Sequence, residues 1–209
     1  MNTRDRLIGA MIDLVRQKGY DAVRVDDVCA MAGVSKGAFF HYFKSKQEIA
    51  EIAADAWRDN SCGLFASQGF VASDDRDASA REKLLRYVDF RIALIEGSSE
   101  IYEFCCYAGT LVQEVHETHP ELSDRAAQGI VAHVAQLEPI CAEALRDAGR
   151  DAAEAAALAQ YFQTVLQGAL LMAKAYRSPS AAVTSLEQFK VQLALLLDGR
   201  QAQTEGNPE

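Results

Sequence analysis

The sequence predicts an all-α protein with a small helical head followed by a larger helical body. Proline is scarce, with four among 209 residues. No segment sustains the alternation of apolar and polar residues that marks a strand, and runs rich in Ala, Leu and Glu recur along the chain. We expect about nine helices, with residues 1–60 forming the head, 61–200 the body and 201–209 a disordered tail.

The composition is that of a globular chain without a membrane segment. Hydrophobic residues make up 49% and charged residues 24% of the sequence, which is ordinary for a globular protein. No apolar run reaches the roughly 18 residues that a membrane helix needs, and no signal-peptide pattern opens the chain. The five cysteines have neither the even number nor the spacing of a disulfide framework. We therefore expect a reduced, cytoplasmic protein with no membrane partner.

Charge is divided unevenly between the head and the body. The net charge is −9, yet residues 1–50 carry eight Lys and Arg against six Asp and Glu, whereas residues 51–209 carry 13 against 24. A mildly basic head on an acidic body confines attraction for phosphate to the head. The acidity of the chain therefore limits where DNA could bind and does not exclude it.

Residues 3–18 and about 26–32 are predicted as the first two helices. The first carries its apolar residues on one face and closes at Gly19, because a glycine just past the last turn is a common helix end. The second begins with acidic residues and is expected to turn Val28 and Met31 inward.

A third helix is predicted from the N-cap Ser35 to about Phe43, after a turn of small residues at Gly33. It carries four aromatic rings in five positions together with cations and a histidine. Such a helix suits a core on one side and a phosphate backbone on the other, as in the second helix of a helix-turn-helix. We expect Phe39 to face the core with Phe43.

The residues predicted to contact DNA lie mainly on this third helix, within a helix-turn-helix that spans about residues 24–43. Gly37 and Ala38 would let the helix backbone approach base edges, and Lys36 would reach a phosphate or a guanine. The predicted set is Arg24, Val25, Ser35, Lys36, Gly37, Ala38, Phe40, His41, Tyr42 and Lys46. The alternative is a small helical subdomain whose cations are only solvated.

Six more helices are expected after the head motif. Ser45 and Glu48 have the spacing of a capping box, so the fourth helix should start there, run to about Phe65 and lead into a polar loop over 66–79. The others are expected over about 79–97, 101–116 with an interruption near Gly109, 122–148 with a kink at Pro139, 151–176 and 180–197. The last two are apolar on more than one face, which predicts a homodimer through them.

The head resembles that of the TetR (tetracycline repressor) family of bacterial regulators. The matching residues are Ala10 through Gly19, Val25-Asp26-Asp27-Val28, Ala32-Gly33-Val34-Ser35-Lys36-Gly37, Tyr42-Phe43 and Lys46. The resemblance, over about residues 4–56, implies an all-α homodimer that binds a pseudo-palindromic DNA operator. It also implies a body that binds a small-molecule inducer, usually in a repressor. The family usually carries a tyrosine where this chain has Phe40, so one hydroxyl for a phosphate contact is missing.

The body is similar to one subgroup of the family around Cys106-Tyr107-Ala108-Gly109 and His119-Pro120-Glu121-Leu122. Some members of that subgroup respond to electrophiles or oxidants, which implies a thiol sensor at Cys106. A nearby cation would raise the thiolate fraction, and Lys174 is the candidate. The predicted sensing set is Cys105, Cys106, Tyr107, Tyr161 and Lys174. The alternative is that both cysteines are small core residues and that Lys174 caps its helix.

Aromatic residues of the body are candidates for lining a pocket, although most such residues form plain core. They are Tyr87, Phe90, Tyr102, Phe104, Tyr107, Tyr161 and Phe162, with Met172 beside them.

No catalytic set, metal site or cofactor is predicted. His116 and His119 are three residues apart and could share a helix face, but Pro120 ends the helix beside them and no third ligand stands at a recognisable spacing. Two other function classes stay open. One is an enzyme that uses Cys106 or the histidine pair, and the other is a helical interaction protein that does not bind DNA.

Overall fold

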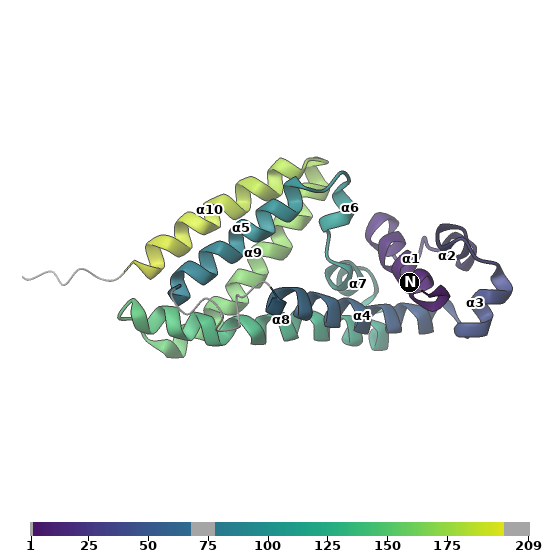
Figure 1. Cartoon of the computed structure of the whole chain (residues 1–209), viewed down its shortest axis with the longest axis horizontal. Coiled ribbons are helices and arrows are strands. Elements are labelled where there is room, and N and C mark those ends of the chain that lie inside the picture. The colour runs from purple at the N-terminus through teal and green to yellow at the C-terminus, as the bar shows by residue number, and fades with distance from the viewer. Residues whose placement is uncertain (1, 68–77, 199–209) are drawn as a thin grey trace, which may run out of the picture.

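The computed structural model describes residues 2–67 and 78–198 (Figure 1). These residues form ten α-helices and one 3₁₀ turn, η1, and the described part of the chain contains no strand, so the predicted all-α class is confirmed. The predicted tail over 201–209 and most of the predicted loop over 66–79 lie outside the described residues.

Three short helices make up the head, close to the predicted bounds: α1 (Thr3–Lys18), α2 (Val25–Ala32) and α3 (Lys36–Tyr42). Helix α1 ends at Gly19 with a φ of 82°, and α2 ends at Gly33 with a φ of 65°. Both backbones lie in the left-handed region that glycine adopts at little cost. Ser35 caps α3 as predicted, since its Oγ accepts a hydrogen bond from the Ala38 N–H at 3.2 Å.

The prediction for the inner face of α3 is confirmed, and the prediction for the inner face of α2 is partly wrong. Phe39 and Phe43 are fully buried in the head. On α2, Val28 is buried but Met31 is 45% exposed. The stripe that α2 turns to the core runs through Val28 and Ala32, one helical turn apart, and Met31 falls outside it.

The body is built on two long helices with an oblique layer above them (Figure 1). Its elements are α4 (Lys46–Ser67), α5 (Ala80–Glu96), α6 (Ile101–Phe104), α7 (Tyr107–Val115), α8 (Pro120–Asp147), η1 (Ala152–Glu154), α9 (Ala155–Tyr176) and α10 (Pro179–Leu197). Helices α4 and α8 run side by side, and α10 packs on α5 and α9. Helices α6 and α7 fill the space between this layer and the head (Figure 1).

The sixth predicted helix is two helices, α6 and α7, and the break lies at Cys105 and Cys106 rather than near Gly109. Arg16 of α1 donates its Nε–H to the Cys105 carbonyl at 2.8 Å and a second N–H to the Glu103 carbonyl. Cys106 becomes the N-cap of α7, because its Sγ accepts a hydrogen bond from the Gly109 N–H. A side chain of the head thus takes carbonyls that a continuous helix would use, and this break accounts for the tenth helix.

The predicted starts of two long helices hold with small changes. At α4, the Ser45 Oγ accepts the Glu48 N–H at 3.0 Å, but the Glu48 carboxylate accepts from the Lys44 N–H instead of closing a full capping box. Helix α8 begins at Pro120, where the missing N–H costs nothing, and it continues as an α-helix through Pro139.

Two hydrophobic clusters organise the chain, and one of them joins the head to the body. The first lies among α5, α8, α9 and α10. The second combines the buried faces of α1 to α4 with Tyr107, Leu111 and Val115 of α7 and Leu122 of α8. The core of the head therefore extends into α7, which gives the body a packed contact with the helices that carry α3.

Candidate functional site

Helix α3 lies at the end of the molecule opposite the C-terminal end of α10 (Figure 1). Two of its aromatic rings face solvent, with Phe40 52% and Tyr42 41% exposed. The other exposed members of the predicted DNA-contacting set on or beside α3 are Ser35, Lys36, Gly37 and His41, and Ala38 is half-buried. Exposed rings beside a cation on a projecting helix are unusual for a surface that meets only water.

The two lysines predicted to contact DNA have different surroundings. Lys36 forms an exposed ion pair with Asp26 of α2, with Nζ and Oδ1 2.9 Å apart, and such a pair is weak enough to exchange for a phosphate. Lys46 is directed into the head. Its Nζ donates to the Tyr20 carbonyl at 3.1 Å and lies 4.1 Å from the centre of the Tyr20 ring.

Arg24 and Val25, also in the predicted set, lie at the start of α2. Arg24 is exposed, and its backbone N–H donates to Asp27 Oδ2 at 2.9 Å. Val25 is half-buried and packs against the core of the head. Lys18 donates to the same Asp27 oxygen at 2.8 Å, so this carboxylate ties the end of α1 to α2.

Helix α7 holds the head through polar contacts as well as apolar ones. The Glu114 carboxylate accepts the backbone N–H groups of Tyr20 and of the next residue at 2.6 and 3.0 Å. Tyr107 is fully buried, and its hydroxyl donates to the Ala50 carbonyl of α4 at 3.0 Å. Tyr107, predicted as a sensing residue, therefore sits in the joint between head and body.

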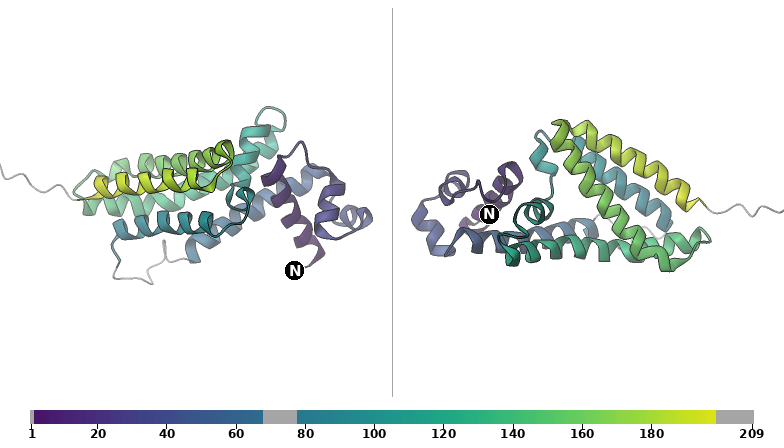
Figure 2. Two further views of the ribbon diagram at one scale, coloured as in Figure 1. Left: turned by 90° about the horizontal axis from the view of Figure 1, so that it is seen from above. Right: turned by 180° about the vertical axis from the view of Figure 1, so that it is seen from behind.

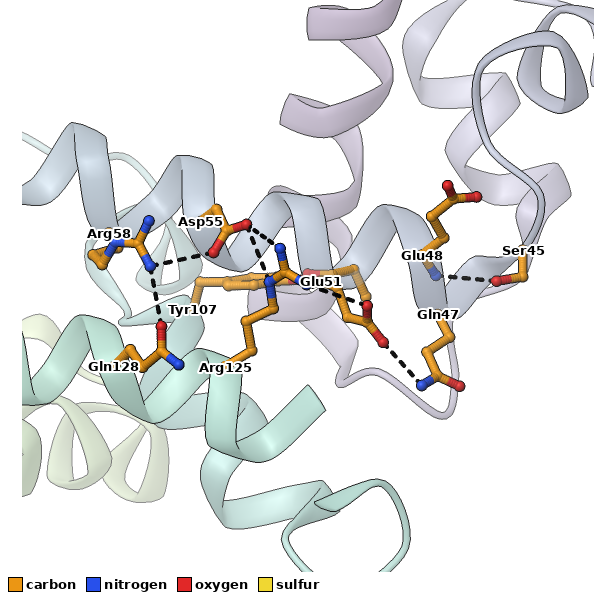
Figure 3. Close-up of polar contacts among 10 residues, drawn as sticks. Ser45, Gln47, Glu48, Glu51, Asp55, Arg58, Tyr107, Arg125 and Gln128 are labelled. Carbon is orange, nitrogen blue, oxygen red and sulfur yellow. Dashed lines mark hydrogen bonds and ion pairs between the residues drawn. The ribbon is translucent and has the colours of Figure 1, made fainter. Parts of the chain in front are cut away.

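A row of ion pairs and hydrogen bonds joins α4 to α8 (Figure 3). Arg125 of α8 lies 2.6 Å from Asp55 and 3.5 Å from Glu51, and Arg58 donates to Asp55 at 3.3 Å and to Gln128 at 3.2 Å. The pKa of Asp55 lies below its usual range, chiefly because Arg125 donates hydrogen bonds to it. These contacts fix the register of α8 against α4, the helix that leads into the head.

A cavity of about 270 Å³ opens in the body. Its lining comes from α1 and from every helix from α4 to α9. The apolar and aromatic lining residues are Trp57, Leu64, Phe65, Tyr87, Phe90, Leu94, Ile95, Phe104, Ala108, Ile130 and Leu166. The polar ones are Arg16, Ser61, Arg91, Ser98, Glu103, His133, Gln163 and Gln167. Among the predicted pocket residues, Tyr87, Phe90 and Phe104 line this cavity, while Tyr102, Tyr107, Tyr161, Phe162 and Met172 lie elsewhere.

A chain of hydrogen bonds crosses the cavity wall, and no local sequence pattern marked it. The Tyr87 hydroxyl lies 2.6 Å from His133 Nε2, and His133 Nδ1 lies 2.6 Å from Gln163 Oε1. Burial lowers the pKa of His133 to about 4, so the ring is neutral near pH 7. The amide oxygen of Gln163 accepts the Nδ1–H, which leaves Nε2 to accept the Tyr87 O–H.

The predicted thiol site is partly assembled. Cys105, Cys106 and Lys174 line a second, smaller cavity of about 110 Å³, and Cys106 also lines the larger one. Burial raises the pKa of the Cys105 thiol, which the cations nearby only partly offset. Lys174 Nζ donates to Thr110 Oγ1 at 3.3 Å. Half-buried Cys106 is therefore the more accessible of the two thiols.

The outer faces of α9 and α10, which lie side by side (Figure 2), carry exposed apolar side chains. These are Tyr161, Leu171, Met172, Tyr176, Val191 and Leu195. Tyr161, predicted as a sensing residue, lines neither cavity, and its hydroxyl donates to Gln192 of α10 at 3.1 Å.

The described residues contain no group of three His, Cys, Asp or Glu side chains placed to share a metal ion. His119 packs its ring against Tyr20, and His116 lies 3.6 Å from the Glu117 carboxylate. Within the part of the chain that the structure describes, no helix is long and apolar enough to cross a membrane.

Two family models match the chain. The model described as bacterial regulatory proteins, tetR family, covers residues 7–53, and that of the LmrA/YxaF-like transcriptional regulator C-terminal domain covers residues 82–184. The chain belongs to the TetR family. The family resemblance seen in the sequence is therefore confirmed, and members of this family are transcriptional regulators.

Individual relatives agree with this assignment. The HTH-type transcriptional regulator CymR of Pseudomonas putida is 45% identical over 57 residues, which is 27% of this chain and 28% of CymR. The chain matches at most 55% of the length of the curated relatives. A TetR regulatory protein from Rhodobacter sphaeroides (TM-score 0.76, 22% identity, covering 91% of this chain and 98% of that one) has the same fold. So does the reduced form of Escherichia coli NemR (TM-score 0.72, 20% identity, covering 91% and 96%).

Proposed function

We propose that this protein is a cytoplasmic, homodimeric transcriptional repressor that binds a pseudo-palindromic DNA operator and is released from it by a small molecule. The observation that carries the proposal is helix α3. It projects from the end of the molecule with Lys36, Phe40, His41 and Tyr42 exposed on a helix whose other face is buried core. Membership of a family of transcriptional regulators supports the same reading.

The first turns of α3 are suited to the major groove. Gly37 and Ala38 have little or no side chain, so the backbone can approach base edges, and a thymine methyl can contact the Ala38 methyl. Lys36 exchanges its exposed partner Asp26 for a phosphate or a guanine. His41 and Tyr42 contact phosphates farther along the helix.

The second copy of the chain joins through α9 and α10. Six apolar side chains are exposed on these two helices, and association would remove them from water. A two-fold dimer places its two α3 helices in half-sites about one helical turn or more apart. An arrangement of the heads that does not match this spacing loses affinity for the operator.

The larger cavity is the inducer site in this proposal. It lies against Arg16, whose guanidinium also holds the carbonyls at the α6–α7 break. A ligand that repositions Arg16 or α7 also moves α1 and the loop held by Glu114, and with them the head. The ligand changes DNA affinity only if it binds the two arrangements of the heads unequally.

Modification of Cys106 is a second route to release. This thiol borders both cavities and is half-buried, so a small electrophile can reach it, and its Sγ caps α7. Alkylation would remove the cap and crowd the start of α7. We expect Cys106→Ser to abolish release by N-ethylmaleimide in a DNA-binding assay, with Cys62→Ser as the control. Release that persists in Cys106→Ser would show that the thiol only packs.

Fluorescence anisotropy with the intergenic DNA beside the gene tests the central proposal. We expect specific binding at low salt, and a loss of about tenfold or more in affinity for Lys36→Ala combined with Tyr42→Ala. Losing the Lys36 phosphate contact should also reduce the salt slope by about one. Lys83→Ala on α5, far from α3, is the matched control and should leave binding unchanged. Absence of a specific complex at low salt would contradict the proposal.

A further inference from the structure

Among the described residues, no acidic side chain forms an ion pair with one of the cations that line the larger cavity. Arg91 of α5 lines the cavity, and its Nε is buried without a hydrogen-bond partner. Burial raises the pKa of the Tyr87 hydroxyl, and the nearby Arg91 guanidinium partly offsets this rise. Among the described residues, no carboxylate forms an ion pair with Arg91. Arg91 is half-buried, and a guanidinium whose Nε is buried without a partner is an incomplete site, because burial of an unpaired polar group is unfavourable.

The other charged groups of the cavity are already engaged. Arg16 pairs with Asp13 at 3.2 Å and donates to two backbone carbonyls. The Glu103 carboxylate accepts the N–H groups of Ser99 and Glu100 at 2.7 and 3.2 Å, so it caps α6. Arg91 is thus the charged group left to meet a ligand.

The Tyr87 hydroxyl offers no proton to that ligand. Its O–H is donated to His133 Nε2, and the His133 Nδ1–H is donated to Gln163. The chain from Tyr87 to Gln163 is therefore a sequence of donors and acceptors with one direction, and the charged donor that remains for a ligand is the Arg91 guanidinium.

The residues around Arg91 determine the size and the apolar character of the rest of the ligand. Aromatic rings of Trp57, Phe65, Phe90 and Phe104 surround the space, and aliphatic side chains complete it. Its volume of about 270 Å³ lies just below the roughly 300–1,000 Å³ of pockets for drug-sized ligands. The occupant is therefore a small molecule with a compact apolar body of one or two rings.

We infer that the cavity binds a small aromatic carboxylate, with its carboxylate on the Arg91 guanidinium and its ring against the aromatic wall. A guanidinium presents two parallel N–H groups to a carboxylate, so the pair is charge-assisted and geometrically specific. This inference deepens the proposed function, because it names the chemical class of the inducer.

Binding of matched acids and amides tests the inference. Trp57 is the one tryptophan of the sequence and lines the cavity, so its fluorescence reports occupancy. The probes are 4-ethylbenzoate and 4-ethylbenzamide, followed by fluorescence, and 1-naphthoate and 1-naphthamide, followed by calorimetry. We expect each acid to bind about tenfold more tightly than its amide or better, as for a hydrogen-bonded charge. Equal affinities, or no binding of either acid, would overturn the inference.

Substitution of Arg91 tests whether its guanidinium causes the preference for the acid. Arg91→Gln should abolish the preference for the acid and leave the affinity for the amide within about twofold. Arg86→Gln, an exposed arginine on the same helix that does not line the cavity, is the matched control and should keep the preference. If Arg91→Gln does not fold, Arg91→Lys replaces it and should reduce the preference by losing the two-pronged contact. A preference unchanged in the folded variant would overturn the inference.

A parallel anisotropy assay separates this inference from the proposed function. If the acids bind through Arg91 but the protein shows no specific DNA complex, the regulator proposal fails and the ligand class stands. If the protein binds DNA and only neutral or cationic compounds occupy the cavity, the ligand class fails and the regulator proposal stands.

Discussion

The head and the cavity of this protein are built in different ways. Helix α3 is seven residues long, and it holds most of the proposed DNA contacts within one short segment, on either side of the buried Phe39. The polar residues of the cavity wall include Arg16, Arg91, His133 and Gln163, which come from four helices spread over most of the chain. A site on one helix keeps its pattern wherever that helix is placed, whereas a site shared among helices exists only when all of them are packed. In the head, the substitutions that lower stability should therefore differ from those that weaken DNA binding. In the cavity, a single substitution should affect both stability and ligand binding.

Adjacent phenylalanines of α3 give the largest expected contrast. Phe39 is fully buried and Phe40 is 52% exposed, although the centroids of their rings are 5.2 Å apart in an edge-to-face arrangement. We expect Phe39→Ala to lower the free energy of unfolding by about 3–5 kcal/mol, because it leaves a cavity in the core of the head. Phe40→Ala should cost about 1 kcal/mol or less and weaken operator binding. Urea unfolding at one fixed protein concentration and DNA anisotropy measure the two effects. Equal destabilisation by the two substitutions would remove the distinction between an inner and an outer face of α3.

Much of the head could be predicted because its signals are local. A serine before a helix, a glycine after one and two aromatics four residues apart each act within one or two turns, so Ser35, Gly33, Phe39 and Phe43 lie as predicted. Met31 shows the limit. Which apolar residues of a short helix face inward depends on which face of that helix the neighbouring helices contact.

The cavity and the sensing residues were harder to predict, since tertiary contacts decide them. The break at Cys105 is set by Arg16, 89 residues away, which takes a carbonyl of the helix. Tyr107 packs into the head, and Tyr161 faces outward, because α7 and α9 turn those positions away from the cavities. His133 meets Tyr87 and Gln163 across separations of 46 and 30 residues, and no spacing in the sequence marks such a trio.

The buried histidine gives a smaller, pH-dependent contrast. The pKa of His133 is lowered to about 4 by burial, whereas an unfolded histidine titrates near 6.5. Between these values the unfolded chain binds more protons than the folded one, so the free energy of unfolding falls as the pH falls from about 6.5 to about 4. This group alone should account for about 3 kcal/mol of that loss, and above pH 7 it should contribute no slope.

His133→Gln isolates this effect by removing the titration. Its free energy of unfolding should fall less steeply between pH 7 and pH 4.5 than that of the wild type, so the difference between the two proteins should shrink as the pH falls. Exposed His116→Gln is the matched control and should follow the wild-type slope. Urea unfolding at a series of pH values and one fixed protein concentration is the measurement. Parallel slopes for wild type and His133→Gln would mean that His133 is not held neutral. The donor chain from Tyr87 to Gln163 would then lose its direction, and the Tyr87 O–H could donate to a ligand beside the Arg91 guanidinium.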